Sequence, residues 1–369
     1  MSPYAHITGW GMCLPEKVLT NDDLAKIVDT NDAWIVERTG IRQRYIAGPH
    51  ETTASLATEA ALQALAVANL NPVKLELIIV STSSPEHLFP ATACLVQDRI
   101  GAIKAGAFDL SAACSGFIFA VNIATQSIRS GAVRNALVIG SETLSRLVNW
   151  KDRNTCILFG DGAGAFVLQT SEEPGGVLSA VMRSDGSGSD SLSVPAGGSR
   201  MPTSAATVAE GLHYIHMNGR EVYRFATRVM SQATHEAVEK AGLTMDDISL
   251  VIPHQANQRI IEAAARGLEI PMERVVMNVD RYGNTSTASI PIATCEAIQE
   301  GRMKPGDKVV FVGFGAGLTW GAAVVLWSGP FPARRRGRPV SYRIWAKIRS
   351  YIRRAVRYLE SLIWGSHVR

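Results

Sequence analysis

One stretch of the chain decides its fold, Phe108-Asp109-Leu110-Ser111-Ala112-Ala113-Cys114-Ser115-Gly116-Phe117. A short apolar segment leads into small residues and a cysteine, and a long apolar run from Phe117 to Ala124 follows. This pattern predicts a buried strand, a tight turn and a hydrophobic helix that begins near Cys114. A strand joined to a helix in this way is the repeating unit of layered α/β folds.

Cys114 is a candidate nucleophile because it is predicted at the start of this helix. Backbone N–H groups without helical partners and the positive end of the helix dipole both favour a thiolate there. The placement is expected to lower the pKa of the thiol from its usual ~8.5 towards neutrality, and the thiolate is the reactive form. An inert buried cysteine fits the same small apolar surroundings, so this stretch alone leaves both explanations open.

Composition restricts the class of protein and its compartment. A chain of 369 residues with 46% hydrophobic content can bury a large core. Its five cysteines are scattered without a CxxC pair, which argues against a disulfide framework or a zinc site and favours a reducing compartment. The segment Met1–Trp10 lacks the features of a signal peptide, and no apolar run approaches the roughly eighteen residues of a membrane span. We therefore expect a cytoplasmic protein without a metal.

Charge is concentrated at the C-terminus. Residues 331–369 hold eleven Lys or Arg and one acid, so they contribute +10 to a total of +4 and leave the body at −6. A basic run, 334–338, is followed by apolar residues at helical spacing from Ile344 to Ile363, with the basic residues largely on other faces. This predicts a basic amphipathic helix. Three roles stay open for it: binding to anionic lipid at the inner membrane face, docking of an acidic carrier protein or another partner, and packing back on the body. Nothing in the body favours nucleic acid.

The second half of the chain repeats the pattern of the first, with buried strands alternating with helices. Inside one helix the segment Ile292–Gly301 matches Ile123–Gly131, and the shared Ile-Ala-Thr at the start of each gives an offset of 169 residues. At this offset Cys114 lies opposite Gly283, next to Asn284. We expect two similar halves related by a pseudo-twofold axis that brings these turns together. The expected domains are residues 1–172, residues 173–330 and the extension, residues 331–369.

Two polar residues follow predicted strands in the second half. His254 follows the apolar strand Leu250–Pro253, and Asn284 follows a strand-end glycine. Taken singly, a buried structural histidine and a helix-capping asparagine are the simpler explanations. Together with Cys114 they form a chemical set, because a cysteine activated by a helix start leaves the imidazole and the amide free to donate hydrogen bonds to a substrate carbonyl.

Six motifs occur in order over residues 1 to about 328. They are Trp34–Ile41, Ala112–Phe117, Phe159–Gly164, His254–Asn257, Tyr282–Ser286 and Gly313–Gly321. In these motifs the chain resembles the β-ketoacyl-acyl-carrier-protein synthase III family of thiolase-superfamily condensing enzymes. The resemblance implies an α/β, thiolase-like, five-layer αβαβα fold that is internally duplicated. The basic amphipathic helix at the C-terminus is an addition to that pattern.

The resemblance also implies a decarboxylating Claisen condensation that initiates fatty acid synthesis. Cys114 would take the acyl group of a short acyl-CoA, and His254 and Asn284 would hydrogen-bond the thioester carbonyl of malonyl-acyl-carrier protein. The backbone N–H groups of Cys114 and Ala316 would hold the oxyanion, and Phe314 would favour decarboxylation. The family commonly has glycine where this chain has Ala316. No cofactor is implied beyond these substrates. The alternative is a related condensing enzyme or acyltransferase of secondary metabolism that uses a different primer.

Other residues match positions that bind substrates and partners in the family. Trp34 and Arg153 match the pair that sandwiches the adenine of CoA. Arg224 and Arg259 match basic positions where the acidic carrier protein docks. Phe89 matches a position that caps the acyl pocket of the partner in a homodimer, and its bulky ring predicts a short primer such as acetyl. The remaining matches to CoA contacts are Thr30, Arg38, Gly219 and Asn257.

Overall fold

Two mixed β-sheets organise the computed structural model, which describes residues 3–329 and 339–364. The first sheet has five strands in the order β1-β7-β6-β4-β5, and the second has four in the order β11-β12-β13-β8. Their inner strands are continuous runs of Val, Ile and Leu, as expected for strands covered on both faces. The strands are β1 (Tyr4–Cys13), β4 (Leu77–Ser81), β5 (Gly106–Leu110), β6 (Asn135–Glu142) and β7 (Gly162–Ser171), then β8 (Gly176–Ser184), β11 (Leu250–Pro253), β12 (Lys308–Gly315) and β13 (Thr319–Leu326).

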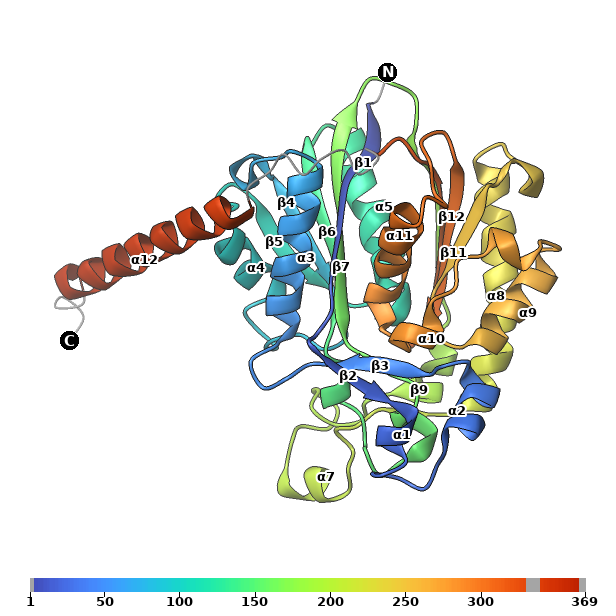
Figure 1. The fold of residues 1–369 in the computed structure, drawn as a ribbon. Helices are drawn as coiled ribbons and strands as arrows, with labels where there is room; N and C mark the ends of the chain where they lie inside the picture. The colour runs from blue at the N-terminus through green and yellow to red at the C-terminus, as the bar shows by residue number, and fades with distance from the viewer. Residues whose placement is uncertain (1–2, 330–338, 365–369) are drawn as a thin grey trace.

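Helices fill three layers around the two sheets (Figure 1). Helices α5 (Gly116–Arg129) and α11 (Ser289–Gln299) lie between the sheets. Helices α3 (Thr53–Val67) and α4 (Thr92–Ile100) cover the outer face of the first sheet. Helices α8 (Gly219–Lys240) and α9 (Gln258–Gly267) cover the second. The five-layer αβαβα prediction is therefore confirmed.

Shorter elements build the rim of the molecule. Strand β2 pairs with β3, and β9 pairs with β10. The bounds are β2 (Lys17–Thr20), β3 (Gln43–Ile46), β9 (Leu192–Ser193), β10 (His216–Met217), α1 (Asn21–Leu24), α2 (Asp32–Thr39), α6 (Arg153–Cys156), α7 (Ala205–Ala209) and α10 (Val279–Tyr282). The 3-10 turns are η1 (Pro72–Lys74), η2 (Ala113–Ser115), η3 (Leu144–Arg146), η4 (Gly186–Ser191), η5 (Met245–Asp247), η6 (Met272–Arg274) and η7 (Ser286–Ala288).

Equivalent turns lead into the two central helices. Turn η2 precedes α5 and turn η7 precedes α11, and each opens with a non-glycine residue at positive φ, 46° for Ala113 and 48° for Ser286. Cys114 thus corresponds to Thr287. The sequence-based pairing of Cys114 with Gly283 is wrong. The helix ends, Arg129 and Gln299, agree with the offset of 169 to within one residue, but α11 begins at Ser289, four residues later than that offset predicts from Gly116. We propose that the halves divide at residues 172 and 330, since the strands of each sheet come from one side of residue 172.

A buried carboxylate joins the two halves beneath these turns. Glu142, at the end of β6, accepts hydrogen bonds from the Ser83 backbone N–H at 3.0 Å and the Ser84 hydroxyl at 2.6 Å. The hydroxyl of Thr287 lies 3.1 Å from the same carboxylate and 2.9 Å from the carbonyl oxygen of Ser81. Burial raises the pKa of Glu142 above its ordinary value. The two halves therefore share one polar network in the core.

The extension forms helix α12 (Pro339–Trp364), which projects from the α4 side of the molecule (Figure 1). The predicted helix is confirmed, whereas the basic run at 334–338 lies outside the described residues. Within the part of the chain that the structure describes, no helix combines the length and hydropathy needed to cross a membrane.

Candidate active site

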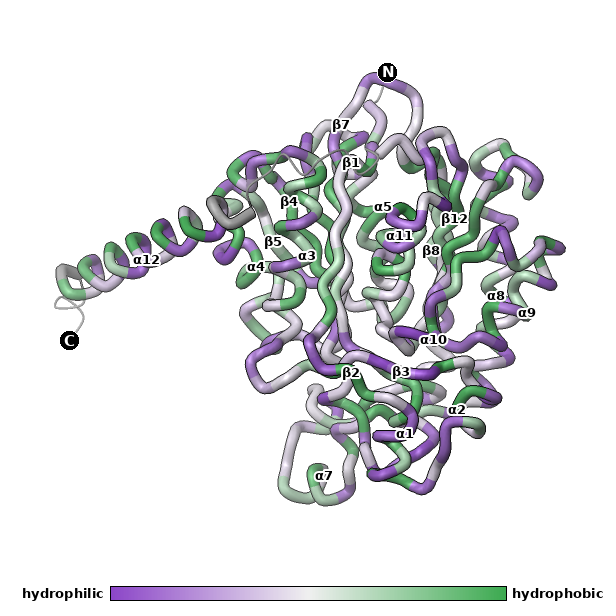
Figure 2. Tube along the Cα trace, in the orientation of Figure 1, coloured by the Kyte–Doolittle hydropathy of each residue, from purple (hydrophilic) through white to green (hydrophobic). Residues whose placement is uncertain are grey.

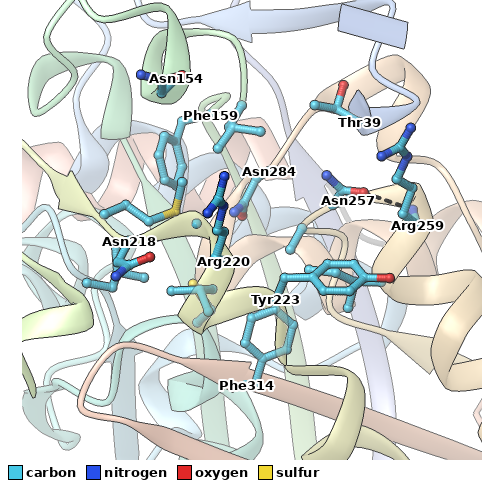
Figure 3. Close-up of a pocket in the computed structure, with 18 of the residues that line it drawn as sticks. Thr39, Asn154, Phe159, Asn218, Arg220, Tyr223, Asn257, Arg259, Asn284 and Phe314 are labelled. Atoms are coloured by element: carbon cyan, nitrogen blue, oxygen red, sulfur yellow. Dashed lines mark hydrogen bonds between the residues drawn. The ribbon is translucent and has the colours of Figure 1, made fainter. Parts of the chain in front are cut away.

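A cavity of about 1230 Å³ contains all three residues of the predicted chemical set. Cys114, His254 and Asn284 line it together with Phe314, although they come from both halves of the chain. Figure 3 labels Asn284 and Phe314 at this cavity. The same cavity is lined by six residues that the resemblance assigned to substrate or carrier-protein contacts. They are Trp34, Arg38, Gly219, Arg224, Asn257 and Arg259.

Cys114 lies in the turn η2 immediately before α5 and is 8% exposed. Burial raises the pKa of its thiol to about 12, against the smaller lowering effect of a hydrogen bond from Ser286. The direction is opposite to that expected from the helix start, because withdrawal from water disfavours the thiolate. The resting nucleophile is therefore a thiol, and its proton must leave as the sulfur forms a new bond.

The end of strand β12 presses against the backbone of the nucleophile. A Cβ added at Gly315 would lie 2.6 Å from the Cys114 nitrogen and 3.2 Å from the Ser115 nitrogen. The Thr319 hydroxyl lies 3.0 Å from the carbonyl oxygens of both Ala112 and Ala316, so it ties the two loops together. The main chain of the Ala316 loop is thus held beside the main chain of Cys114. This proximity is what a pair of N–H donors for one oxyanion requires.

We expect Gly315→Ala to impair acylation of Cys114, because the new methyl group must displace the turn that holds the sulfur. Overpacking of this kind typically costs about 1–3 kcal/mol of stability. The measurement is the rate of covalent mass gain with acetyl-CoA, alongside a thermal melt. Gly313→Ala in the same strand is the matched control, because its Cβ would make ordinary contacts with side chains, at 3.4 Å to His254 Cβ and Ile118 Cδ1 and 3.6 Å to Ile290 Cδ1. Equal losses in the two variants would contradict a specific role for the Gly315 contact.

His254 follows β11 and is held so that one ring nitrogen faces the cavity. Its Nδ1 lies 2.8 Å from the Ser289 hydroxyl oxygen, which also accepts the Gln255 backbone N–H at 3.3 Å. Among the described residues its buried Nε2 has no hydrogen-bond partner. With Ser289 donating to Nδ1, the ring proton lies on Nε2, where it can be donated to a ligand. Burial lowers the pKa of His254 to about 3, so the imidazole is neutral at physiological pH.

Asn284 presents its amide in a fixed orientation. Its side-chain oxygen accepts the Ser286 backbone N–H at 2.9 Å, and its side-chain NH₂ donates to no other residue that the structure describes. Backbone hydrogen bonds with Leu158 at 2.8 Å and Gly160 at 3.0 Å fix the loop to the first half of the chain. The cavity therefore contains an imidazole donor and an amide donor near a thiol. Such a set can polarise a thioester carbonyl and stabilise an enolate.

Aromatic and basic side chains gather where α2 meets the cavity. The guanidinium carbon of Arg38 lies 4.4 Å from the centroid of the Trp34 ring, and that of Arg153 lies 5.2 Å from it. Two stacked contacts of about 3.5 Å each require about 7 Å, so a base between Trp34 and Arg153 would have to move the arginine. Arg153 also pairs with Asp29 at 3.5 Å.

Asn257 links the two helices at this mouth. Its side-chain NH₂ donates to the Arg38 carbonyl oxygen at 2.9 Å. Its side-chain oxygen accepts the backbone N–H of Arg259 at 2.8 Å (Figure 3). Asn257 therefore joins α2 to α9 in this structure.

Four residues named by the resemblance are not among those that line the cavity, namely Thr30, Phe89, Arg153 and Ala316. Phe89 is 86% exposed at a loop tip beside Leu88, which is 85% exposed. Conversely, Arg220 and Tyr223 on α8 line the cavity and were missed by the sequence analysis (Figure 3). The signal was present, since Arg220 precedes Arg224 by one helical turn and therefore shares its face.

Comparison with known proteins agrees with this geometry. The family model for 3-oxoacyl-[acyl-carrier-protein] synthase III matches residues 108–186, and the model for its C-terminal part matches residues 238–327. A β-ketoacyl-[acyl-carrier-protein] synthase III of Roseiflexus sp. (strain RS-1) is 53% identical over 328 residues, which are 89% of this chain and all of the relative. The chain belongs to the β-ketoacyl-acyl-carrier-protein synthase III family. The resemblance seen in the sequence is thus confirmed, and the chain is a condensing acyltransferase.

Other members of the synthase III family support the assignment at the level of sequence and of fold. The enzyme of Symbiobacterium thermophilum is 57% identical over 321 residues, 87% of this chain and 97% of the relative. The crystal structure of 3-oxoacyl-[acyl-carrier-protein] synthase III from Aquifex aeolicus VF5 has a TM-score of 0.81 and 50% identity, and covers 88% of this chain and 100% of its own. Helix α12 lies beyond residue 327, where the match to the family model ends.

Proposed function

We propose that this synthase III condenses a short acyl-CoA, with acetyl-CoA as the expected primer, with malonyl-acyl-carrier protein to give 3-oxoacyl-acyl-carrier protein. This reaction initiates fatty acid synthesis. The observation that carries the proposal is the convergence of a thiol, a neutral imidazole and an oriented amide in one cavity. The test is a sequential one. Acetyl-CoA alone should add an acetyl mass to Cys114, and malonyl-acyl-carrier protein should then remove it with release of CO₂.

In the first half-reaction, the Cys114 sulfur attacks the acyl-CoA carbonyl and the bond from that carbonyl to the CoA sulfur breaks. The thiol proton of Cys114 ends on the CoA sulfur, so no net charge remains in the buried site. The backbone N–H groups of Cys114 and Ala316 are proposed to hold the oxyanion of the tetrahedral intermediate. The close approach of β12 to the nucleophile supports this pairing.

In the second half-reaction, the malonyl thioester loses CO₂ and its carbonyl oxygen gains enolate charge. His254 Nε2 and the Asn284 amide are proposed to donate hydrogen bonds to that oxygen. The enolate carbon attacks the acyl-Cys114 carbonyl, and the carbon–sulfur bond breaks with the electron pair on sulfur. The resulting Cys114 thiolate takes up one proton from solvent water, so the half-reaction consumes one proton and releases CO₂. The Phe314 ring lies 5.3 Å from the His254 ring at 66°, and this edge contact keeps an apolar wall where the carboxylate leaves.

We propose that Thr30, Trp34, Arg38, Arg153, Gly219 and Asn257 contact CoA, as the resemblance implies. The aromatic ring of Trp34 is the group suited to stack on the adenine base. Arg220, Arg224 and Arg259 all line the cavity, and these three residues are called the basic margin. Their positive charge suits the phosphate groups of CoA and the acidic carrier protein.

We expect Trp34→Ala to raise the KM for acetyl-CoA roughly tenfold with little change in kcat, because base stacking on an aromatic ring is worth about 1–3 kcal/mol. Acylation kinetics with acetyl-CoA measure the effect. Acetyl-pantetheine is the control substrate, since it carries the same thioester without the adenine. An equal rise in KM for acetyl-pantetheine would show that Trp34 acts on the cavity as a whole and would remove the stacking role.

We propose that the enzyme works in the cytoplasm as a homodimer and that its extension contacts the inner face of the membrane peripherally. The exposed loop tip at Leu88 and Phe89 supports the dimer, because two large apolar side chains fully in water favour a partner surface. Phe89 would then cap the acyl pocket of the second copy and limit the primer to a short chain.

A further inference from the structure

Helix α12 is seated on the body through a small side chain and an ion pair. Ala346 is 4% exposed and packs on Gly101, where even an added Cβ would come within 3.2 Å of the Ala346 Cβ. Arg343 pairs with Glu59 of α3 at 2.9 Å. The absence of a side chain at Gly101 therefore allows the helix to approach the body closely.

A second anchor lies one turn further along the same face. The Ser350 hydroxyl donates a hydrogen bond to Asp98 at 2.7 Å, and Arg354 pairs with the same carboxylate at 3.6 Å. Together with Arg343 and Ala346, these residues recur three or four positions apart and share one side of the helix. The side that faces the body therefore carries small, polar and basic residues, together with Tyr342 in its first turn, which packs against the apolar core beneath α3 and α4.

The apolar side of α12 points away from the body. Figure 2 shows hydrophobic and hydrophilic residues alternating along the projecting helix. A surface helix ordinarily turns its apolar side inward, and α12 has the opposite orientation. Its outward apolar residues are 43–77% exposed and comprise Ile344, Ile348, Tyr351, Ile352, Val356, Leu359 and Leu362. Trp345 lies at the edge of this face, where it borders Val73 and Ile100 of the body.

We propose that this outward face inserts into the surface of a membrane that contains anionic lipid. Residues 339–364 carry six Lys or Arg and one acid, so the helix suits a negatively charged partner. Lys347 and Arg349 flank the apolar residues, with Arg353 and Arg357 further round the helix. Long basic side chains at such edges extend their charges towards lipid head groups while the apolar face is buried. Association with a second copy of α12 is disfavoured, because it would bring two helices of the same net positive charge together.

This inference rests on the proposed peripheral contact and specifies its face and its lipid. The position of α12 is compatible with catalysis, because α8 and α9 carry the basic margin on the other side of the molecule (Figure 1). A membrane held at α12 would leave the mouth of the cavity open to the carrier protein.

The test uses the full chain and sedimentation with two kinds of vesicle. We expect binding to phosphatidylcholine vesicles with about one third phosphatidylglycerol, weaker binding as salt is raised, and little binding to phosphatidylcholine alone. Condensation activity with soluble carrier protein is followed in parallel, so that a failure of the proposed reaction is recognised separately. A full chain that stays in the supernatant with anionic vesicles would overturn the inference.

A matched pair of variants separates the apolar face from overall charge. Leu359→Glu places a carboxylate on the outward apolar face, whereas Ser361→Glu adds the same charge on the polar side. We expect at least a tenfold loss of vesicle binding for Leu359→Glu and a much smaller loss for Ser361→Glu, with both variants active. Equal losses of vesicle binding in the two variants would show that the contact is purely electrostatic and would contradict insertion of the apolar face. A change of molar mass in light scattering for Leu359→Glu alone would assign the face to a second copy and also overturn the inference.

Discussion

The Cys114→Ala protein is expected to gain no mass when it is incubated with acetyl-CoA, while the wild-type protein gains one acetyl group. Removal of the sulfur removes the acyl acceptor, and condensation should fall by at least ~10³-fold, as for other covalent nucleophiles. Intact-protein mass spectrometry measures the first effect, and product formation from malonyl-acyl-carrier protein measures the second. The substitution is small and apolar at a buried position, so the melting temperature should change little.

Cys94→Ala provides the control for Cys114→Ala, because Cys94 is an exposed cysteine on α4, outside the cavity. This variant should acquire the acetyl group as the wild type does. An acetyl group that persists in Cys114→Ala and disappears in Cys94→Ala would show that Cys94 is the acyl acceptor. That result would contradict the mechanism proposed above.

His254→Ala is expected to separate the two half-reactions. Acylation of Cys114 should continue, whereas decarboxylation of malonyl-acyl-carrier protein should fall roughly 10²- to 10³-fold, the usual effect of losing one donor to a developing oxyanion. Release of CO₂ and acyl-enzyme mass are measured on the same sample. His235→Ala, which changes an exposed histidine of α8, should leave both steps intact. Loss of acylation with normal decarboxylation would contradict the assigned role.

The same imidazole predicts a pH profile. Because burial lowers the pKa of His254 to about 3, the ring takes up a proton only as the pH falls towards that value. Decarboxylation should therefore lack the decline between pH 8 and 5 that an ordinary histidine of pKa ~6.5 would cause. A titration near 6.5 that vanishes in His254→Ala would show that the ring is more accessible to water than the structure describes.

Two residues of the chemical set were predictable from strand ends, since β5 leads to Cys114 and β11 directly precedes His254. The strand predicted before Asn284 is wrong, because the short helix α10 and its C-cap Gly283 precede this residue. Continuous apolar strands, small residues and a helix start located Cys114, and the repeat of this pattern located His254 and Asn284. The repeat also predicted two sheets with helices between them. The register between the halves was less accurate, since α11 begins four residues later than the offset of 169 from α5 predicts, which moves the counterpart of Cys114 from Gly283 to Thr287.

The ionisation state of Cys114 was not predictable in the same way. A helix start favours the thiolate, and burial of the same sulfur opposes it by a larger amount. Local sequence reports the helix start, whereas burial depends on the whole packed fold. The orientation of α12 has a similar explanation. Spacing defines an apolar face, but only the contacts with Glu59, Asp98 and Gly101 determine that the opposite face meets the body.

The carboxylate of Glu142 has a consequence for how this enzyme would lose function. It lies 3.1 Å from the Thr287 hydroxyl of the second half and is bonded to the Ser83–Ser84 loop of the first. A shift between the two halves would take the Thr287 hydroxyl away from the buried Glu142 side chain. The same shift would separate the Cys114 sulfur from His254 and Asn284. When the Glu142 network is weakened, activity should therefore be lost at a lower temperature than the one at which the protein unfolds. The turnover rate would then report how well the two halves are aligned.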